Sequence, residues 1–288
     1  MKLSVITINY NNLAGLQKTA QSVISQVYDD FEYIIVDGGS TDGSSELLIS
    51  LQENALMRGL VCKYVSETDR GIYHAMNKGI AMASGDYLHF LNSGDWLLSN
   101  DVYKSIFSDL TEDVPILYGN MLKVLANGRR VLDKEVLNLS FHTFYRGSLN
   151  QPVYFHSKEL FQKYCVFDES FRIVADWKWY FQVVLVEKTP LTYKNVDVAL
   201  FDMNGISSIN KSLDAMERSR YLSEILPTFA IEAFENRLES IEMLDRLKKY
   251  RLIYAFIGIL ERVLFKYERF STKLRFIFYH KKLLKIKN

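Results

Sequence analysis

Four short apolar runs alternate with stretches of helical spacing in the first third of the chain. The runs cover residues 3–8 (LSVITI), 31–36 (FEYIIV), 61–65 and 87–91. Stretches of helical character lie between them, at residues 13–25, 44–52 and 72–83. Strands that alternate with helices of these lengths are typical of βαβ units, whose parallel strands are joined by right-handed crossovers. The sequence therefore predicts an α/β fold, with a mostly parallel central sheet flanked by helices.

The alternation becomes less regular after residue 95, and we expect this part to receive a second substrate. The expected elements are helices at 103–110, 158–164 and 177–187, and strands at 116–125 and 130–136 around an Asn127-Gly128 hairpin turn.

The sequence predicts a domain boundary at residues 205–212, because the pattern beyond them is almost wholly helical. We therefore expect one domain at 1–210, composed of halves at 1–98 and 99–210, and a helical C-terminal region at 211–288.

The distribution of charge is uneven along the 288 residues, although the formal net charge is only +1. From Lys248 onward the sequence contains twelve lysines and arginines, and its only acidic residues are Glu261 and Glu268, so the tail carries about +10. The only cysteines, Cys62 and Cys165, lie in apolar or strand-like contexts, which argues against a disulfide scaffold or a zinc site. The composition fits an acidic body in a reducing compartment, with a basic tail that binds an anionic partner.

The run 31–36 ends in Asp37-Gly38-Gly39-Ser40, at the position where an α/β sheet binds ligands. It is neither a dinucleotide fingerprint nor a phosphate-binding GxxxxGK[ST] loop. A phosphoacceptor aspartate would need further acids near the chain start, where Thr7 and Asn9 stand instead. The alternative is that this turn only caps the next helix.

A second unusual segment reads DRGIYHAMNKG over residues 69–79. Arg70 near the start of the predicted helix and Lys78 late on it are cations that could reach a diphosphate. The alternative is a helix with ordinary capping and a solvated lysine. A lone helical histidine such as His74 is more often a surface or packing residue than a ligand.

The third segment, GDYLHFLNSGDW at residues 85–96, is a short buried-type strand that stops at a polar turn. A carboxylate in such a turn lies at the carboxyl edge of the sheet. We therefore expect Asp95 beside a metal-bound phosphate group.

In this order and spacing, the three segments and the early Asn9-Tyr10-Asn11 resemble a family 2 glycosyltransferase with the GT-A fold. The resemblance covers residues 3–210. It implies that Asp37 contacts the base or ribose of a nucleotide-sugar, and that the same nucleotide pocket is lined by Thr7, Asn9, Asp69 and Lys78.

The turn at residues 92–95 occupies the place of the family's DXD-type motif. Common members read Asp-Ala-Asp-Asp, whereas Asn92 and Gly94 replace two carboxylates here. The resemblance leaves Asp95 as the one anionic ligand for Mg²⁺ or Mn²⁺. Asn92 is expected to be either a neutral oxygen ligand or a ribose contact, and Ser93 a substrate contact. Substrate phosphates and water can complete the shell of such a cation, so we expect weak metal affinity without nucleotide.

The segment FRIVADWKW at residues 171–179 resembles the family's acceptor side, and Asp176 matches its general base. A hydroxyl that attacks the anomeric carbon must lose its proton to a nearby base, and the resemblance implies inversion at that carbon. The alternative for Asp176 is a helix cap beside packed tryptophans. Gln151 stands where several members carry a His-Gln pair and is expected to face a sugar. Residues 204–208 resemble a loop that closes over the site.

The tail carries apolar and aromatic residues at helical spacing over residues 260–278, beside a strip of lysines and arginines. This pattern favours a membrane-surface helix, and the alternative is a packing helix whose cations face water. No base-reading motif accompanies the charge, so a nucleic-acid partner is not expected. The first apolar run is broken at Asn9 and is read as a strand rather than a secretory signal.

Together these observations predict an inverting, metal-assisted transfer of a sugar from a nucleotide-sugar to a hydroxyl of a glycan acceptor. We expect a lipid-linked acceptor in surface polysaccharide biosynthesis, and a cytoplasmic protein that is peripheral on the inner face of the cytoplasmic membrane. Two alternatives remain open: transfer to a polyprenyl phosphate, and a catalytically silent nucleotide- or glycan-binding module.

Overall fold

The computed structural model describes residues 2–108, 110, 114–124, 129–133, 139–201 and 210–248. The chain forms two compact units, Met1–Tyr221 and Leu222–Asn288. The sheet and all the expected site residues lie in the first unit.

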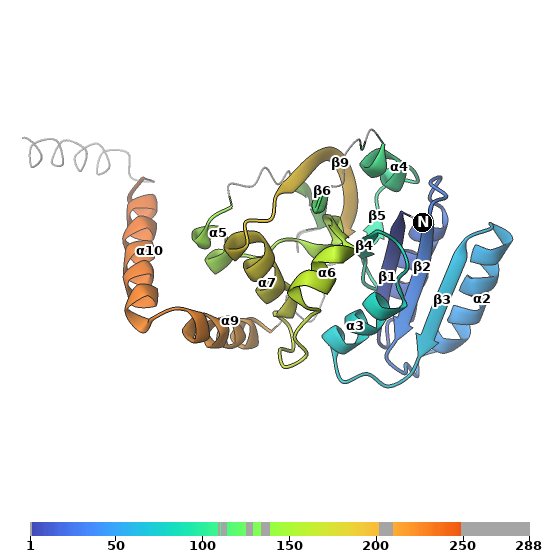
Figure 1. Cartoon of the computed structure of the whole chain (residues 1–288), viewed down its shortest axis with the longest axis horizontal. Coiled ribbons are helices and arrows are strands. Elements are labelled where there is room, and N and C mark those ends of the chain that lie inside the picture. The colour runs from blue at the N-terminus through green and yellow to red at the C-terminus, as the bar shows by residue number, and fades with distance from the viewer. Residues whose placement is uncertain are drawn as a thin grey trace, which may run out of the picture. The chain divides into compact units, whose positions relative to one another are not determined.

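One nine-stranded sheet forms the centre of the first unit, among the residues that the structure describes (Figure 1). Its main path runs in the order β3-β2-β1-β4-β8-β6-β9-β5, and β7 pairs with β6. The strands are β1 (Leu3–Asn9), β2 (Phe31–Asp37), β3 (Val61–Ser66), β4 (Tyr87–Phe90), β5 (Trp96–Leu97), β6 (Ile116–Val124), β7 (Arg130–Asp133), β8 (Tyr154–Ser157) and β9 (Leu191–Phe201).

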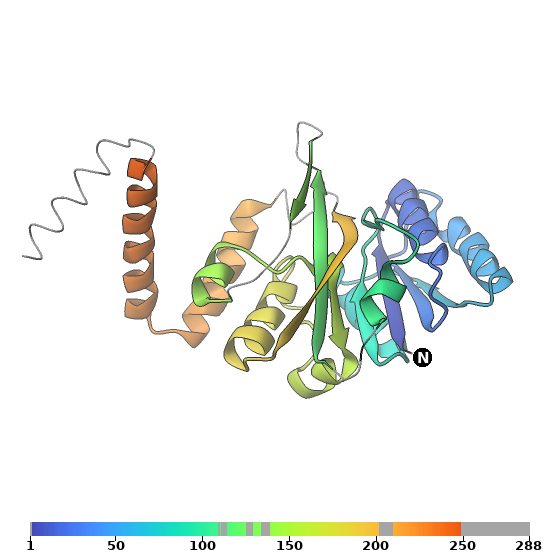
Figure 2. The same ribbon diagram turned by 90° about the horizontal axis from the view of Figure 1, so that it is seen from above.

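The first half of the sheet is parallel, as the alternating pattern predicts. Strands β3, β2, β1 and β4 lie side by side in one direction, and every residue of β2 is buried. Helices α1 (Leu13–Ile24) and α2 (Ser44–Met57) pack against each other, whereas α3 (Ile72–Met82) packs on β1 and β2 (Figures 1 and 2). A strand buried under helices on both faces needs a continuous apolar run, which explains why these strands are readable from the sequence.

Close packing fixes α3 against the sheet. A Cβ at Gly79 would collide with the side chain of Ile6 on β1, so only glycine lets the helix approach this closely. The buried residues of α3 include Tyr73 and Met76, which turn the apolar side of the helix inward.

The second half of the sheet is mixed. β8 runs antiparallel to both β4 and β6, β9 runs parallel to β6, and β5 adds an antiparallel edge to β9. The expected pairing of β6 with β7 is present, whereas the Asn127-Gly128 turn between them lies outside the described residues. β8 and β9 were not expected from the sequence. β9 carries polar residues such as Asp197, which accepts a hydrogen bond from Asn120 at 2.8 Å, so it lacks the apolar run of a buried strand.

The helices of the second half are short. They are α4 (Val102–Phe107), α5 (Phe141–Arg146), α6 (Lys158–Tyr164) and α7 (Ala175–Tyr180), with a 3₁₀ turn η1 (Gln151–Val153) and a π-helical segment η2 (Phe181–Val186). The single helix expected at 177–187 is therefore an α-helix that continues as a π-helix. The π segment places Phe181 in an aromatic cluster with Phe144, Trp177 and Tyr221.

Two longer helices follow, α9 (Lys211–Ile225) and α10 (Thr228–Lys248), as the helical character of this region predicts. No helix in the described residues is long and apolar enough to cross a membrane. The loop expected at 204–208 and the basic helix expected at 260–278 lie outside the described residues.

Candidate functional site

The polar residues singled out in the sequence gather where the parallel strands end. Asn9 is paired with Asp37 at the ends of β1 and β2, and Asp37 is paired with Ser66 at the end of β3. The turn after β4 joins them, since the Ser93 backbone N–H donates to the Ile8 carbonyl at 3.1 Å. This carboxyl edge is where α/β sheets bind ligands.

Asp37 is the most extensively hydrogen-bonded carboxylate of this edge. It accepts from Asn9 Nδ2 at 2.8 Å and from the hydroxyls of Ser40 at 2.5 Å and Ser66 at 2.7 Å. Burial alone would raise the pKa of Asp37, but these bonds and the backbone N–H of Ser40 outweigh it and lower the pKa. Asp37 is thus a fixed anion that holds the strand ends together.

Asn9 and Thr7 occupy different environments on β1. Asn9 Oδ1 is buried and has no hydrogen-bond partner within the described part of the chain. Thr7 is fully buried, and its hydroxyl donates to the Leu91 carbonyl at 2.7 Å and accepts from the Tyr33 hydroxyl at 3.0 Å. Asn9 therefore offers an acceptor oxygen at the edge, whereas the Thr7 hydroxyl is engaged within the sheet.

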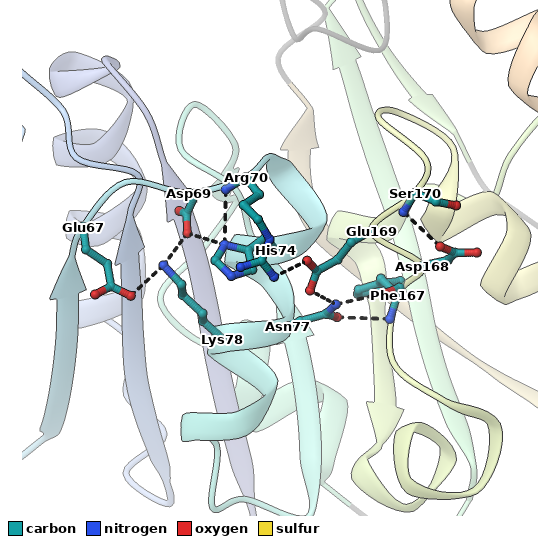
Figure 3. Close-up of polar contacts among 10 residues, drawn as sticks. All are labelled: Glu67, Asp69, Arg70, His74, Asn77, Lys78, Phe167, Asp168, Glu169 and Ser170. Atoms are coloured by element: carbon teal, nitrogen blue, oxygen red, sulfur yellow. Dashed lines mark hydrogen bonds and ion pairs between the residues drawn. The ribbon is translucent and has the colours of Figure 1, made fainter.

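Asp69 and Lys78 meet beside this edge (Figure 3). Lys78 Nζ lies 2.5 Å from Asp69 Oδ1 and 2.7 Å from Glu67 Oε1, and His74 Nδ1 lies 3.0 Å from the same Asp69 oxygen. The other oxygen, Asp69 Oδ2, is buried without a hydrogen-bond partner in the described residues. His74 is thus a neighbour of Asp69, and this contact is compatible with the surface or packing role expected from the sequence.

Tyr10 and Asp69 both lie close to Gly38, and the sequence assigned no role to Tyr10 beyond its place in Asn9-Tyr10-Asn11. A Cβ on Gly38 would lie 3.2 Å from the Tyr10 ring and 3.3 Å from Asp69 Oδ2, tighter than ordinary van der Waals contact. Tyr10 is 67% exposed, so an accessible aromatic ring stands beside an unpartnered carboxylate oxygen.

The turn Asn92-Ser93-Gly94-Asp95 is held from α1. The Thr19 hydroxyl accepts from the Gly94 N–H at 3.0 Å and donates to the Asp95 carbonyl at 2.6 Å. Gly94 has a φ of 108°, a conformation that favours glycine, so the residue that replaces a family carboxylate also permits the turn. Asn12 Nδ2 donates to the Ser93 carbonyl at 3.1 Å.

Oxygen donors of this turn suit a hard divalent cation. Asp95 is 5% exposed, and Asn92 Oδ1 is a buried oxygen without a partner in the described residues. No three His, Cys, Asp or Glu side chains among those residues gather in a way that could hold a metal ion. A cation held here would depend on substrate oxygens and water in addition to the turn.

Asp176 lies in the first turn of α7 and is half-buried. Its Oδ1 accepts a hydrogen bond from the Tyr73 hydroxyl at 2.7 Å. Burial raises the pKa of Asp176 above its usual range, although the hydrogen bonds from Tyr73 and the Trp177 N–H and the charge of Arg218 act in the opposite direction. A carboxylate with raised proton affinity is suited to act as a base.

Helix α9 supports the segment that carries Asp176. Glu217 accepts from the backbone N–H groups of Arg172 at 2.7 Å and Ile173 at 3.1 Å. The Arg218 guanidinium lies 4.7 Å from the centroid of the Trp177 ring. Local sequence patterns could not reveal these interactions, because they join segments 41 to 45 residues apart.

Arg70 forms an ion pair with Glu169 (Figure 3). Its guanidinium lies 2.7 Å from Glu169 Oε2, so the cation that the sequence suggested for a diphosphate is paired with an acid. Gln151, at the start of η1, is buried, and its Nε2 lies 3.9 Å from the sulfur of Met76 on α3.

Comparison with known proteins identifies a family for the chain. The sequence model described as Glycosyl transferase family 2 matches residues 4–158. An uncharacterised glycosyltransferase of Mycobacterium tuberculosis is 35% identical over 211 residues, which are 72% of this chain and 77% of the relative. A PGL/p-HBAD biosynthesis glycosyltransferase of Mycobacterium bovis is 28% identical over 208 residues, with coverages of 71% and 78%.

Solved structures share the fold at lower identity. TarS of S. aureus, residues 1–349 in complex with UDP-GlcNAc, matches with a TM-score of 0.57, 20% identity, and coverage of 72% of this chain and 60% of that one. The mannosyltransferase PcManGT of Pyrobaculum calidifontis, in complex with GDP-Man and Mn²⁺, matches with a TM-score of 0.55, 15% identity, and coverages of 72% and 58%. The chain thus spans about three fifths of the length of either structure.

The family model covers more than half of the chain, and the match to the relative from Mycobacterium tuberculosis covers 72% of it. These matches and the shared architecture confirm the resemblance read from the motifs: the chain is a glycosyltransferase of family 2 with the GT-A fold.

Proposed function

We propose that the enzyme transfers a sugar from a nucleoside-diphosphate donor to a hydroxyl of a glycan acceptor, with inversion at the anomeric carbon. The observation that carries this proposal is Asp176, a half-buried carboxylate whose pKa is raised by burial and whose Oδ1 is held by Tyr73. Such a group takes up a proton more readily than a solvated aspartate.

The donor site is assigned to the carboxyl edge of the parallel strands. The buried unpartnered oxygens of Asn9 and Asp69 are acceptors, so the proposed ligand supplies N–H or O–H groups to them. Ribose hydroxyls and the ring N–H of uracil or guanine meet this need. The complexes of TarS with UDP-GlcNAc and of PcManGT with GDP-Man support a uracil or guanine donor.

Further residues of the same edge complete the proposed donor site. The exposed ring of Tyr10 is assigned to stacking on the base. Thr7 and Asp37 act indirectly, through the strand ends that they fix, and Lys78 holds Asp69 in place. Ser93 and Gln151 are assigned to the substrate's sugar and phosphate side, as the family resemblance implies.

Asp95 and Asn92 would hold a divalent cation, Mg²⁺ or Mn²⁺, through their oxygens. When bound, such a cation stabilises the negative charge of the departing diphosphate. PcManGT, which carries Mn²⁺, supports this assignment.

The proposed reaction is a single displacement. The acceptor oxygen forms a bond to the anomeric carbon while the bond from that carbon to the diphosphate oxygen breaks on the opposite face. Asp176 receives the proton of the attacking hydroxyl.

The acceptor is proposed to be a lipid-linked glycan, in surface polysaccharide biosynthesis at the inner face of the cytoplasmic membrane. The support lies in the sequence, where the last 41 residues carry about +10 of charge next to apolar and aromatic residues. We expect the full-length protein to float with vesicles containing phosphatidylglycerol, and less so as salt is raised. Recovery of all the protein at the bottom of the gradient would contradict the membrane assignment.

A donor panel tests the function itself. UDP-, GDP- and dTDP-sugars are titrated with Mn²⁺ present, with ADP- and CDP-sugars as controls that lack a ring N–H at the base. We expect one of the first three to bind and to be transferred. Binding by none of them would overturn the donor assignment.

Matched variants then separate the roles. Asp176→Asn should abolish turnover but retain donor binding, and Asp95→Ala should weaken only the metal-dependent part of donor binding. Asp29→Asn is the control, since Asp29 is an exposed acid with a side chain 93% accessible. Full activity of Asp176→Asn would refute the base, and a mild loss would indicate a phosphate acceptor such as a polyprenyl phosphate.

A further inference from the structure

A buried tyrosine connects the nucleotide side of the molecule with the proposed base. Tyr73 lies in the first turn of α3 and is 4% exposed. Its hydroxyl donates to Asp176 Oδ1 at 2.7 Å, across 103 residues of sequence. Its ring packs against Phe167, with 5.7 Å between the ring centroids.

The direction of this hydrogen bond is settled by the environment of the phenol. Burial, reinforced by the nearby charge of Asp176, raises the pKa of Tyr73 well above its usual value. The hydroxyl therefore keeps its proton and acts as the donor. A hydrogen bond donated to a carboxylate stabilises its ionised form, so Tyr73 opposes the effect of burial on Asp176.

The position of Tyr73 is fixed from several sides. Gly79 allows α3 to lie directly against Ile6 of β1, and the side chain of Asn77 is hydrogen-bonded to the backbone of Phe167 at 2.9 Å. Among the charged groups of the described residues, Arg218 of α9 acts on Asp176. The helix that carries the phenol is thus attached both to β1 and to the segment that leads to Asp176.

We propose that Tyr73 is the positioning residue of the base: its hydroxyl fixes Oδ1 of Asp176, keeps the carboxylate ionised, and leaves Oδ2 to take the proton of the acceptor hydroxyl. This proposal rests on the assignment of Asp176 as the base. It adds a function to the donor-side helix, because the segment that lines the nucleotide edge through Asp69 and Lys78 also orients the group that serves the acceptor.

The first test measures the carboxylate directly and needs no turnover. Protein with ¹³C-labelled aspartate carboxyls is titrated by NMR, and the Asp176 signal is identified by its loss in Asp176→Asn. In Tyr73→Phe the pKa of Asp176 should rise by about one pH unit, the equivalent of one lost charge-assisted hydrogen bond. An unchanged or lowered pKa would overturn the proposal.

Two further protein variants test whether the shift comes from the lost hydrogen bond or from altered packing. Tyr87→Phe removes another buried tyrosine hydroxyl, which donates to the Val114 carbonyl at 2.6 Å, and should leave the Asp176 titration unchanged. Incorporation of 3-fluorotyrosine at position 73 makes the hydroxyl a stronger donor and should lower the Asp176 pKa. A shift of the same sign in all three proteins would attribute the effect to altered packing and refute the positioning role.

The second test uses the reaction. In Tyr73→Phe, kcat at the optimum should fall about tenfold with the donor KM unchanged, and the acid limb of the kcat profile should move to higher pH. An unmoved acid limb in an active variant would refute the proposal. Failure of the proposed function is distinguishable, because it would show as absence of transfer by the unsubstituted enzyme while the NMR shift is still observed.

Discussion

The side chain of Asn77 forms a two-sided pair with the backbone of Phe167. The Phe167 N–H donates to Asn77 Oδ1 at 3.0 Å, and Asn77 Nδ2 donates to the Phe167 carbonyl at 2.9 Å (Figure 3). Asn77 Nδ2 also lies 3.1 Å from Glu169 Oε1. One amide therefore attaches α3 to the segment that leads to Asp176.

Removal of this amide should destabilise the protein. In Asn77→Ala, the N–H and carbonyl of Phe167, a residue 3% exposed, lose their partners, and we expect a loss of about 2 kcal/mol in the free energy of unfolding. Urea denaturation measures it. The control is Asn54→Ala at an exposed position of α2, where the change should stay within about 0.5 kcal/mol. Equal stability of the two variants would show that the pairing contributes nothing.

Glu217 offers a kinetic prediction for the same segment. Glu217→Ala leaves the N–H groups of Arg172 and Ile173 without their acceptor, which should lower kcat several-fold with the donor KM unchanged. Glu217→Gln keeps one acceptor oxygen and should lie between this variant and the unsubstituted enzyme. Steady-state kinetics with Glu224→Ala as the exposed control on α9 provide the measurement. A raised donor KM with unchanged kcat would contradict the role assigned to Glu217.

The parallel half of the fold could be predicted from the sequence because its strands are buried on both faces. Its apolar runs are continuous, and their polar ends meet at one edge by the geometry of parallel strands. That geometry also placed Asn9, Asp37 and Asp69 near one another. The strand β9 escaped prediction because its polar residues bond within the sheet, where local sequence gives no indication of burial.

The interactions of the site were harder to predict than its residues. Arg70 and Glu169 are 99 residues apart, and Tyr73 and Asp176 are 103 apart. Which cation remains available to a ligand depends on such tertiary pairing. Composition and spacing show that Arg70 and Lys78 are present, but not that each already faces an acid.

Glu32 should make the protein sensitive to acid. It is fully buried, paired with Lys63 at 2.6 Å, and hydrogen-bonded by Ser4 and Ser84. Burial would raise its pKa, but these partners lower it to about 2, below the unfolded value. The ionised form therefore stabilises the protein above about pH 4.5, and this stabilisation is lost as the pH falls toward 2.

Comparison of Glu32→Gln with the unsubstituted protein isolates this contribution. At pH 7 we expect Glu32→Gln to be less stable by about 2 kcal/mol in the free energy of unfolding; the partial exposure of Lys63 keeps this value modest. Below pH 4.5 the difference between the two proteins should decline. Urea midpoints across this range supply the test. A difference independent of pH would contradict the ionised pairing.

Two buried histidines act in the same direction at higher pH. Burial lowers the pKa of His89 to about 4 and that of His156 to about 3, whereas unfolded histidine titrates near 6.5. The unfolded state thus binds two more protons near pH 5, and stability should fall there by about 2.5 kcal/mol per pH unit on acidification. His89→Gln should be less stable at pH 7. The dependence of its unfolding free energy on pH near pH 5 should be weaker, by the equivalent of about one bound proton. Equal slopes from urea denaturation would refute the neutral state of His89.

The contact of Gly79 with Ile6 has a consequence for chimeras that combine segments of two related glycosyltransferases. Helix α3 belongs by sequence to the donor half, and it is locked to β1 by a contact that only glycine allows. Its residues 73 and 77 nevertheless meet Asp176 and Phe167 of the acceptor half. A chimera that takes residues 1–98 from another glycosyltransferase would therefore import the neighbour of the proposed base together with the proposed donor site. If Asp176 is the base as proposed, a swap of the donor half must keep residues 73 and 77 matched to the acceptor half.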